Sequence, residues 1–311
     1  MRSVWLTAVL VVSVYGYDLT GRIDPPSTMP VFLHGTSSPF ETETMSGPDG
    51  RFRFRKLAAG TYTLAVSTQA RGEALQTIEL SPGTVDSKGR LDVVVKIGRN
   101  RLETDGVHAR GATVSAIVLS IPEPALREYR EAQRCLSRRE SECASEHLRK
   151  AVGIAPKFTA AWNQLGTIAY QTGRFPEAEA NFRKALAADA EAFEPLVNLG
   201  GVLLNLSRPK EALSYNREAV ARRPNNALAN SQLGLTYFEL EDLSEAEKYL
   251  KLAVAIDPAH FSHPQLVLAD IYLRRGDMQA ARAALSDFLE RHPDASEAAG
   301  VRRTIASLES R

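Results

Sequence analysis

Residues 125–295 repeat a pattern of small and apolar residues every 34 positions, and this period constrains the fold more than any other feature. Leu-Gly pairs and two sets of alanines recur at that step: Leu165, Leu199, Leu233; Ala178, Ala212, Ala246; Ala185, Ala219, Ala253. In one unit Trp162, Leu165 and Ala169 share one helical face, and Ala178 and Phe182 share another. One such unit cannot bury both faces, so neighbouring units must stack.

This register resembles the tetratricopeptide repeat, a helix-turn-helix unit of 34 residues. The matching residues are Trp162, Leu165, Gly166, Ala178, Phe182 and Ala185. The resemblance implies a right-handed α-α superhelical solenoid of five repeats over 125–295. The first unit, 125–158, lacks the Leu-Gly pair, and one extra residue near 259–262 shifts the last. Val301, Ile305 and Leu308 form an apolar stripe that predicts a capping helix over 296–311.

Residues 17–120 have a different pattern, with short alternating runs between Gly, Pro, Asn and Asp clusters. This pattern is typical of an antiparallel β-sandwich with about seven strands. We expect strands near 18–23, 31–34, 51–54, 60–66, 75–80, 91–97 and 114–119. The chain is therefore predicted to be a multidomain protein, with a β domain followed by an all-α domain.

The β segment resembles the carboxypeptidase regulatory-like, prealbumin-like sandwich. The residues that carry the resemblance are Asp49, Gly50, Phe52, Phe54, Leu57, Gly60, Tyr62 and Leu64. Each of them forms a turn or fills the core of that fold, so the resemblance brings no catalytic group. We interpret Phe52, Phe54 and Tyr62 as core residues, because aromatic side chains at strand spacing are mostly buried.

Residues 1–16 combine a charged start, a short apolar run and a small residue at Gly16. This is the pattern of a secretory signal peptide, and it predicts a periplasmic or secreted protein cleaved near Gly16. The apolar run is shorter than the ~20 residues that a membrane-spanning helix needs, so no stable membrane span is expected. The alternatives are an uncleaved apolar N-terminus or the first strand of the sandwich.

The two cysteines of the chain, Cys135 and Cys143, are expected late in the first helix and early in the second helix of the first repeat. In an oxidising compartment they can form a disulfide across that hairpin. The alternative is a pair of small, buried thiols, since free cysteine packs readily in protein interiors.

Charge and chemistry exclude several function classes. With 38 Lys and Arg against 37 Asp and Glu, the net charge of +1 is too small to attract nucleic acid. The sequence shows no phosphate-binding glycine loop and no catalytic triad motif, so we expect neither an enzyme nor a cofactor. Asp257, His260 and His263 fall in a turn between repeats. We interpret them as solvated rather than as a metal site.

The residue before each central Leu-Gly pair is an amide: Gln164, Asn198 and Gln232. This row resembles the asparagine ladder in the repeats of glycosyltransferases that modify Ser and Thr, which implies binding of an extended polypeptide through its main chain. Tyr170, Leu204 and Phe238 form an apolar row on the same helices. Alternatively, the amides are solvent-facing filler.

We therefore predict a non-catalytic interaction adaptor or scaffold that binds a protein or peptide in the concave groove of the solenoid. The alternative is an exported protein that recognises carbohydrate or a cell surface through its sandwich.

Overall fold

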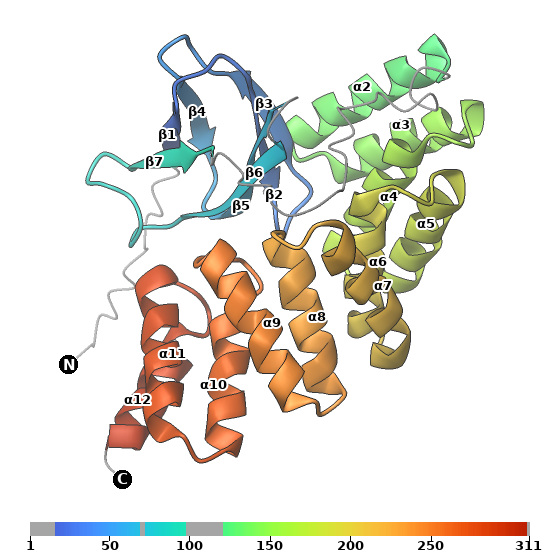
Figure 1. The fold of residues 1–311 in the computed structure, drawn as a ribbon. Coiled ribbons are helices and arrows are strands. Elements are labelled where there is room, and N and C mark those ends of the chain that lie inside the picture. Colours follow the sequence, from blue (N-terminus) through green and yellow to red (C-terminus); the bar gives the residue numbers. More distant parts are fainter. Residues whose placement is uncertain (1–15, 69–71, 98–120, 310–311) are drawn as a thin grey trace, which may run out of the picture.

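The computed structural model describes residues 16–68, 72–97 and 121–309, in which strands in two sheets precede eleven helices (Figure 1). Residues 1–15, in which a signal peptide is predicted, and the expected strand at 114–119 lie outside the described residues. The strands are β1 (Tyr17–Asp24), β2 (Pro30–Gly35), β3 (Glu41–Met45), β4 (Arg51–Leu57), β5 (Gly60–Thr68), β6 (Gly72–Leu80) and β7 (Arg90–Lys96).

The strands form a three-stranded sheet, β4-β1-β7, and a four-stranded sheet, β3-β2-β5-β6. Alternate residues of β4 point inward, so Phe52 and Phe54 join the core between the sheets. The turn before β4 needs a glycine at position 50. Its φ is +76°, and a Cβ there would lie 2.7 Å from the Ile23 carbonyl oxygen.

Two features of the β unit differ from the sequence expectation. Strand β1 pairs in parallel with β7, whereas a fully antiparallel sandwich was expected. Strand β3 was not predicted, because its sequence Glu-Thr-Glu-Thr-Met lacks the apolar alternation that marks a half-buried strand. Among the described strands it pairs only with β2, and it forms one edge of the four-stranded sheet.

The helices pack as successive hairpins. They are α2 (Glu123–Ser137), α3 (Ser141–Ile154), α4 (Thr159–Gln171), α5 (Phe175–Ala188), α6 (Phe193–Asn205), α7 (Pro209–Arg222), α8 (Ala227–Glu239), α9 (Leu243–Ile256), α10 (Pro264–Arg274), α11 (Met278–Arg291) and α12 (Ala298–Glu309). No described helix combines the length and the apolarity that crossing a membrane requires.

The small residues of the repeat allow the helices of one hairpin to approach closely. A Cβ at Gly166 of α4 would lie 2.5 Å from the Phe182 ring of α5, so the aromatic ring takes the space that a side chain would fill. Val301 of α12 is buried against α10 and α11, in a cluster with Ala269, Leu285 and Phe288. Helix α12 therefore covers the apolar end of the array.

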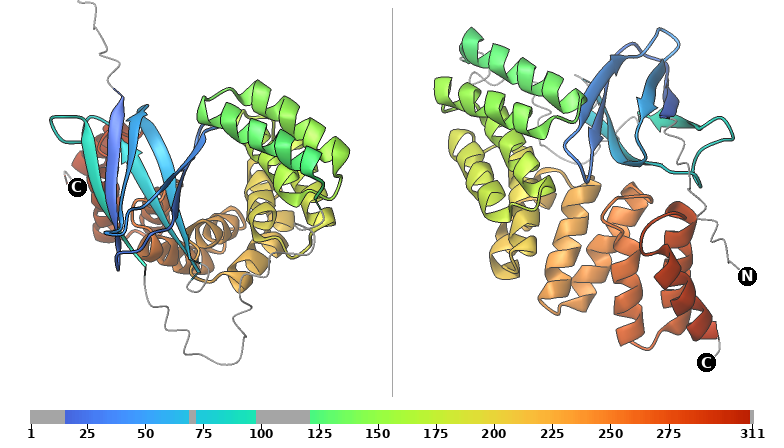
Figure 2. Two further views of the ribbon diagram at one scale, coloured as in Figure 1. Left: turned by 90° about the horizontal axis from the view of Figure 1, so that it is seen from above. Right: turned by 180° about the vertical axis from the view of Figure 1, so that it is seen from behind.

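The sandwich lies inside the curve of the helical array. Figure 2 (left) shows the strands between the first hairpins and the last ones. The two outer strands of the four-stranded sheet, β3 and β6, lie on the sides that face these two ends of the array. The four-stranded sheet thus spans the space between the two ends of the solenoid.

Candidate binding surfaces of the solenoid

The amides predicted for the groove lie on α4, α6 and α8, the first helices of three successive hairpins. Gln164 donates from Nε2 to the Glu41 carboxylate of β3 at 3.2 Å. Asn198 donates from Nδ2 to Asn163 Oδ1 at 3.1 Å, which links α6 to α4. Gln232 is 9% exposed, and its Nε2 approaches Gly201 so closely that a Cβ there would be only 2.4 Å away. The three amides therefore have three different environments.

The apolar row follows the same helices. The Tyr170 hydroxyl accepts a hydrogen bond from Asn205 Nδ2 at 3.0 Å, and Leu204 packs in the same cluster as Tyr170. The Arg274 guanidinium lies 4.5 Å from the centre of the Phe238 ring. All three apolar side chains are half-buried, so they support contacts between repeats and keep part of their surface exposed.

Within the residues that the structure describes, the sandwich touches the array at two places. The first of them we call the N-terminal contact. It joins Arg139, Gln164 and Gln171 to residues 35–41 and Tyr62. Gln171 donates from Nε2 to the Gly35 carbonyl at 2.8 Å. Arg139, in the turn between α2 and α3, lies 4.4 Å above the Phe40 ring and donates to the Tyr62 hydroxyl at 2.7 Å. This contact is polar and partly open to solvent.

The second place, the C-terminal contact, joins Thr77, Glu79 and Gly83 to Asp257, His292 and Asp294. The Asp257 carboxylate accepts from the backbone N–H of Thr77 at 3.1 Å and from its hydroxyl at 2.6 Å, and both residues are buried. His292 Nδ1 lies 2.8 Å from Glu79 Oε2, and the histidine is 1% exposed. The Gly83 N–H donates to Asp294, which closes the contact at its exposed end.

Burial shifts the pKa values of ionisable groups at and beside the C-terminal contact. It raises the pKa of Asp257 above its usual value, although the hydrogen bonds from Thr77 oppose the shift. Burial also lowers the pKa of His260 to about 4, helped by the neighbouring His263 and His292. The pKa of His263 is also lowered, mainly by burial and then by the neighbouring His292. The interpretation of Asp257 and His260 as solvated turn residues was wrong, because both are buried. Thr77 of the sandwich covers Asp257, whereas His260 Nδ1 lies 2.7 Å from Ser262 Oγ within the array.

The residues of the C-terminal contact were missed by sequence reasoning. Thr77 and Glu79 alternate with the core residues Ile78 and Leu80, so they point away from the core of the sandwich. Such positions normally face water. Their burial arises from residues about 180 positions later in the chain. No local pattern in the sequence indicates this pairing.

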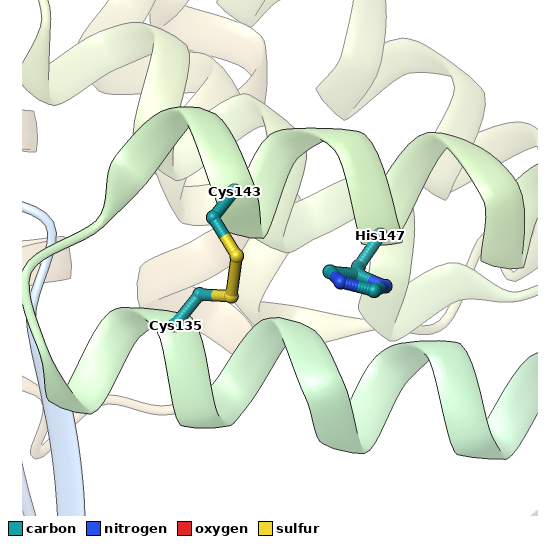
Figure 3. A group of neighbouring side chains, drawn as sticks. All are labelled: Cys135, Cys143 and His147. Carbon is teal, nitrogen blue, oxygen red and sulfur yellow. A yellow bond between two sulfur atoms is a disulfide. The ribbon is translucent and has the colours of Figure 1, made fainter.

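The two cysteines meet across the first hairpin. The structure pairs Cys135 of α2 with Cys143 of α3 in a disulfide, with their Cα atoms 5.8 Å apart (Figure 3). His147, one turn after Cys143, lies beside them, and its Nδ1 is 2.7 Å from Glu128 Oε2. The loop that the disulfide closes contains Arg139, so the pair fixes the turn that reaches the sandwich.

Comparison with known proteins places the helical part in a family. One model of the tetratricopeptide repeat matches residues 125–193, 163–227 and 197–260, and a second matches 238–305. Together they cover 125–305, more than half of the chain. The Cell division cycle protein 16 homolog of Homo sapiens is 30% identical over 125 residues, which are 37% of this chain and 20% of that protein.

Two further proteins are similar to this chain. The Type IV pilus assembly protein PilF of Pseudomonas aeruginosa is 29% identical over 150 residues, 47% of this chain and 59% of that protein. The chain thus spans less than two thirds of both relatives. The solved structure of MamA (41-end) from Desulfovibrio magneticus RS-1 superposes with a TM-score of 0.51 at 25% identity, over 57% of this chain and 99% of that one. The chain belongs to the tetratricopeptide repeat family.

Proposed function

We propose that this protein is an exported, non-catalytic scaffold that holds a partner polypeptide on the inner surface of its solenoid. The family supports a protein-interaction role in general. The observation that carries the finer proposal is the series of half-buried amide and apolar side chains on α6 and α8, represented by Asn198, Leu204 and Phe238. Amides donate and accept, so they pair with the main chain of an extended segment whatever its side chains.

The sandwich limits where a partner can lie. Gln164 is engaged by Glu41, and Gln232 is buried, so a polypeptide following all three amides would meet strand β3 at the first of them. We therefore place the partner along the central hairpins, α6/α7 and α8/α9, between the two contacts with the sandwich. The sandwich serves as a brace for this surface rather than as the recognition module.

The partner class follows from the same surface and from a relative. PilF is by name a type IV pilus assembly protein, and 150 of its residues are similar to this chain. We propose a protein partner bound through an extended segment, with no nucleic acid and no cofactor.

The test starts by capturing the partner from an extract with the full chain and identifying it by mass spectrometry. Calorimetry then compares wild type with the Asn198→Ala variant. The amide of Asn198 can donate one hydrogen bond to the partner and accept another, and loss of two hydrogen bonds of about 1 kcal/mol each predicts a Kd raised roughly tenfold or more. Lys210→Ala, an exposed change on α7, is the matched control. An unchanged Kd in a folded Asn198→Ala variant contradicts the proposal and moves recognition to the sandwich or to the outer face.

Export is the second part of the proposal. The apolar pattern of residues 1–16 and the pairing of Cys135 with Cys143 both suit an oxidising compartment outside the cytoplasm. The mature chain is expected to begin near Tyr17. N-terminal sequencing of protein recovered from the producing cells tests this, and an intact Met1 on protein from the cytoplasmic fraction would reject it.

A further inference from the structure

Cys135, Cys143 and His147 form a compact group of potential metal ligands between α2 and α3 (Figure 3). The two sulfur atoms and a ring nitrogen all lie within 4.8 Å of one another. Within the described part of the chain, these three cysteine and histidine side chains are close enough to one another to share one ion. Cys143 and His147 are four residues apart on α3, so both face Cys135 across the hairpin.

His147 is already oriented by a second carboxylate. Its Nδ1 lies 2.7 Å from Glu128 Oε2, and Glu128 sits two turns before Cys135 on the same face of α2. A carboxylate that accepts the Nδ1–H of a histidine fixes the tautomer and leaves Nε2 unprotonated as a donor to a cation. This arrangement is common behind metal-bound histidines, and the disulfide itself has no need of it.

We propose that reduction of the disulfide converts this group into a binding site for Cu(I). The step requires a dithiol reductant, such as a periplasmic or secreted thiol-disulfide oxidoreductase. Two electrons and two protons pass from the dithiol to the Cys135–Cys143 bond, which gives two thiols while the reductant becomes a disulfide. Cu(I) then displaces the two thiol protons and binds both sulfurs and Nε2 of His147.

The donor set selects the cation. Two thiolates and one imidazole are soft ligands that prefer Cu(I) or Zn²⁺ over hard cations such as Mg²⁺ and Ca²⁺. Zn²⁺ normally takes four ligands, whereas Cu(I) is satisfied by the three that the hairpin supplies. Reducing conditions that open the disulfide also keep copper in the Cu(I) state. The conditions that free the two thiols therefore also keep copper in the oxidation state that the site binds.

The geometry allows the ion to enter. Cys135 is 4% exposed, while Cys143, His147 and Glu128 are half-buried, so the group opens to solvent on one side. Metal–sulfur bonds of about 2.3 Å hold two sulfurs no more than about 4.6 Å apart, and the two sulfurs, which are bonded to each other in the disulfide, separate within that limit once the bond is reduced. The hairpin can therefore bind the ion with a small movement of its side chains. The inference does not depend on the proposed groove.

The experiment uses the full chain, reduced with a phosphine and kept under nitrogen. Cu(I) is supplied as its complex with a coloured chelator, and transfer to the protein is followed by loss of colour. We expect reduced wild type to take one Cu(I) per chain and untreated protein, which has no free thiol, to take none. X-ray absorption at the copper edge should then show two sulfur neighbours and one nitrogen neighbour.

Variants separate the site from adventitious binding. Cys135→Ser/Cys143→Ser should abolish transfer, and His147→Gln should weaken affinity about tenfold or more. His147→Gln retains both cysteines, so it tests the site even if the double variant fails to fold. Lys150→Gln, on the exposed face of α3, is the control and should match wild type.

Three results would overturn the proposal. The first is Cu(I) retention equal in wild type and in His147→Gln. The second is a disulfide that the phosphine reduces only after the protein is denatured. The third is retention of Zn²⁺ with no retention of Cu(I), which would leave a metal site with a different ion.

Discussion

The two contacts between sandwich and solenoid use different chemistry for the same task. The N-terminal contact relies on Arg139 above an aromatic ring and on amide donors to backbone and carboxylate oxygens, largely within reach of water. The C-terminal contact buries a carboxylate and a histidine, Asp257 and His292, each against one partner on β6. Exposed polar contacts contribute little and tolerate change, whereas a buried polar group is costly once its partner is removed. The C-terminal contact should therefore dominate the stability of the assembly.

The largest loss of stability is expected for Asp257→Ala, which removes the buried carboxylate of the C-terminal contact. The change leaves the buried N–H and hydroxyl of Thr77 without an acceptor, and we expect a loss of about 3 kcal/mol in the free energy of unfolding. Asp257→Asn keeps an acceptor oxygen and removes the buried charge, so its loss should stay near about 1 kcal/mol. Urea unfolding measures both variants. Equal losses in the two variants would show that shape, rather than hydrogen bonding, holds this contact.

Acid should weaken the part of the array beside the C-terminal contact, around the buried His260. The pKa of His260 is about 4 in the fold against an ordinary 6.5, so the unfolded chain binds the proton first as the pH falls. Stability from this group is lost between pH 6.5 and 4, by about 2 kcal/mol between pH 7 and pH 5. His263 and His292 face the same group, and the lowered pKa of His263 acts in the same direction. The raised pKa of Asp257 acts in the opposite direction, with stability from that group rising as the pH falls.

The measurement compares urea midpoints at pH 7 and pH 5 for wild type and His260→Gln. The variant lacks the titrating ring, so its midpoint should fall less on acidification. The same fall in both proteins would assign the acid sensitivity to other groups.

A smaller effect is expected at the N-terminal contact. Arg139→Ala removes the cation over Phe40 and the hydrogen bond to Tyr62, for a loss of about 1 kcal/mol. Arg138→Ala is the matched control, because the Arg138 side chain makes a long, exposed ion pair with Glu140, at 3.8 Å, and no other ion pair or hydrogen bond within the described part of the chain. Thermal unfolding at low and high salt should separate the two variants. A loss above that of Asp257→Ala would reverse the ranking of the contacts.

The smallest loss of stability is expected for a substitution at Gln171. Gln171→Glu keeps the shape of the side chain but removes the N–H donors to the Gly35 and Thr36 carbonyls, and it should cost about 0.5–1 kcal/mol. The loss should shrink at acid pH, where the new carboxyl group is protonated and donates again. Chemical unfolding at pH 7 and pH 4.5 checks this, and a pH-independent loss would contradict it.

Local patterns in the sequence predicted the fold class but not the joining of its parts. The recurring Leu-Gly pairs and alanines fixed the helical hairpins because each helix buries its own stripe. Thr77 and Asp257 carried no such signal, since Thr77 lies on the face of its strand that normally meets water and Asp257 lies in a turn between repeats. The amide spacing placed Gln164, Asn198 and Gln232 on successive helices. It did not reveal that Gln232 is buried, which depends on the missing side chain of Gly201 in the preceding repeat.

The sandwich also changes how the repeats depend on one another. In an open solenoid each repeat is stabilised only by its neighbours, and the two terminal repeats have one neighbour each and fray first. Here the first hairpin is tied to β3 and the β2–β3 loop, and the loop after α11 is tied to β6. The sandwich thus links the two ends of the array, so that each terminal hairpin has a second neighbour. A terminal hairpin can unfold only after its contact with the sandwich is broken.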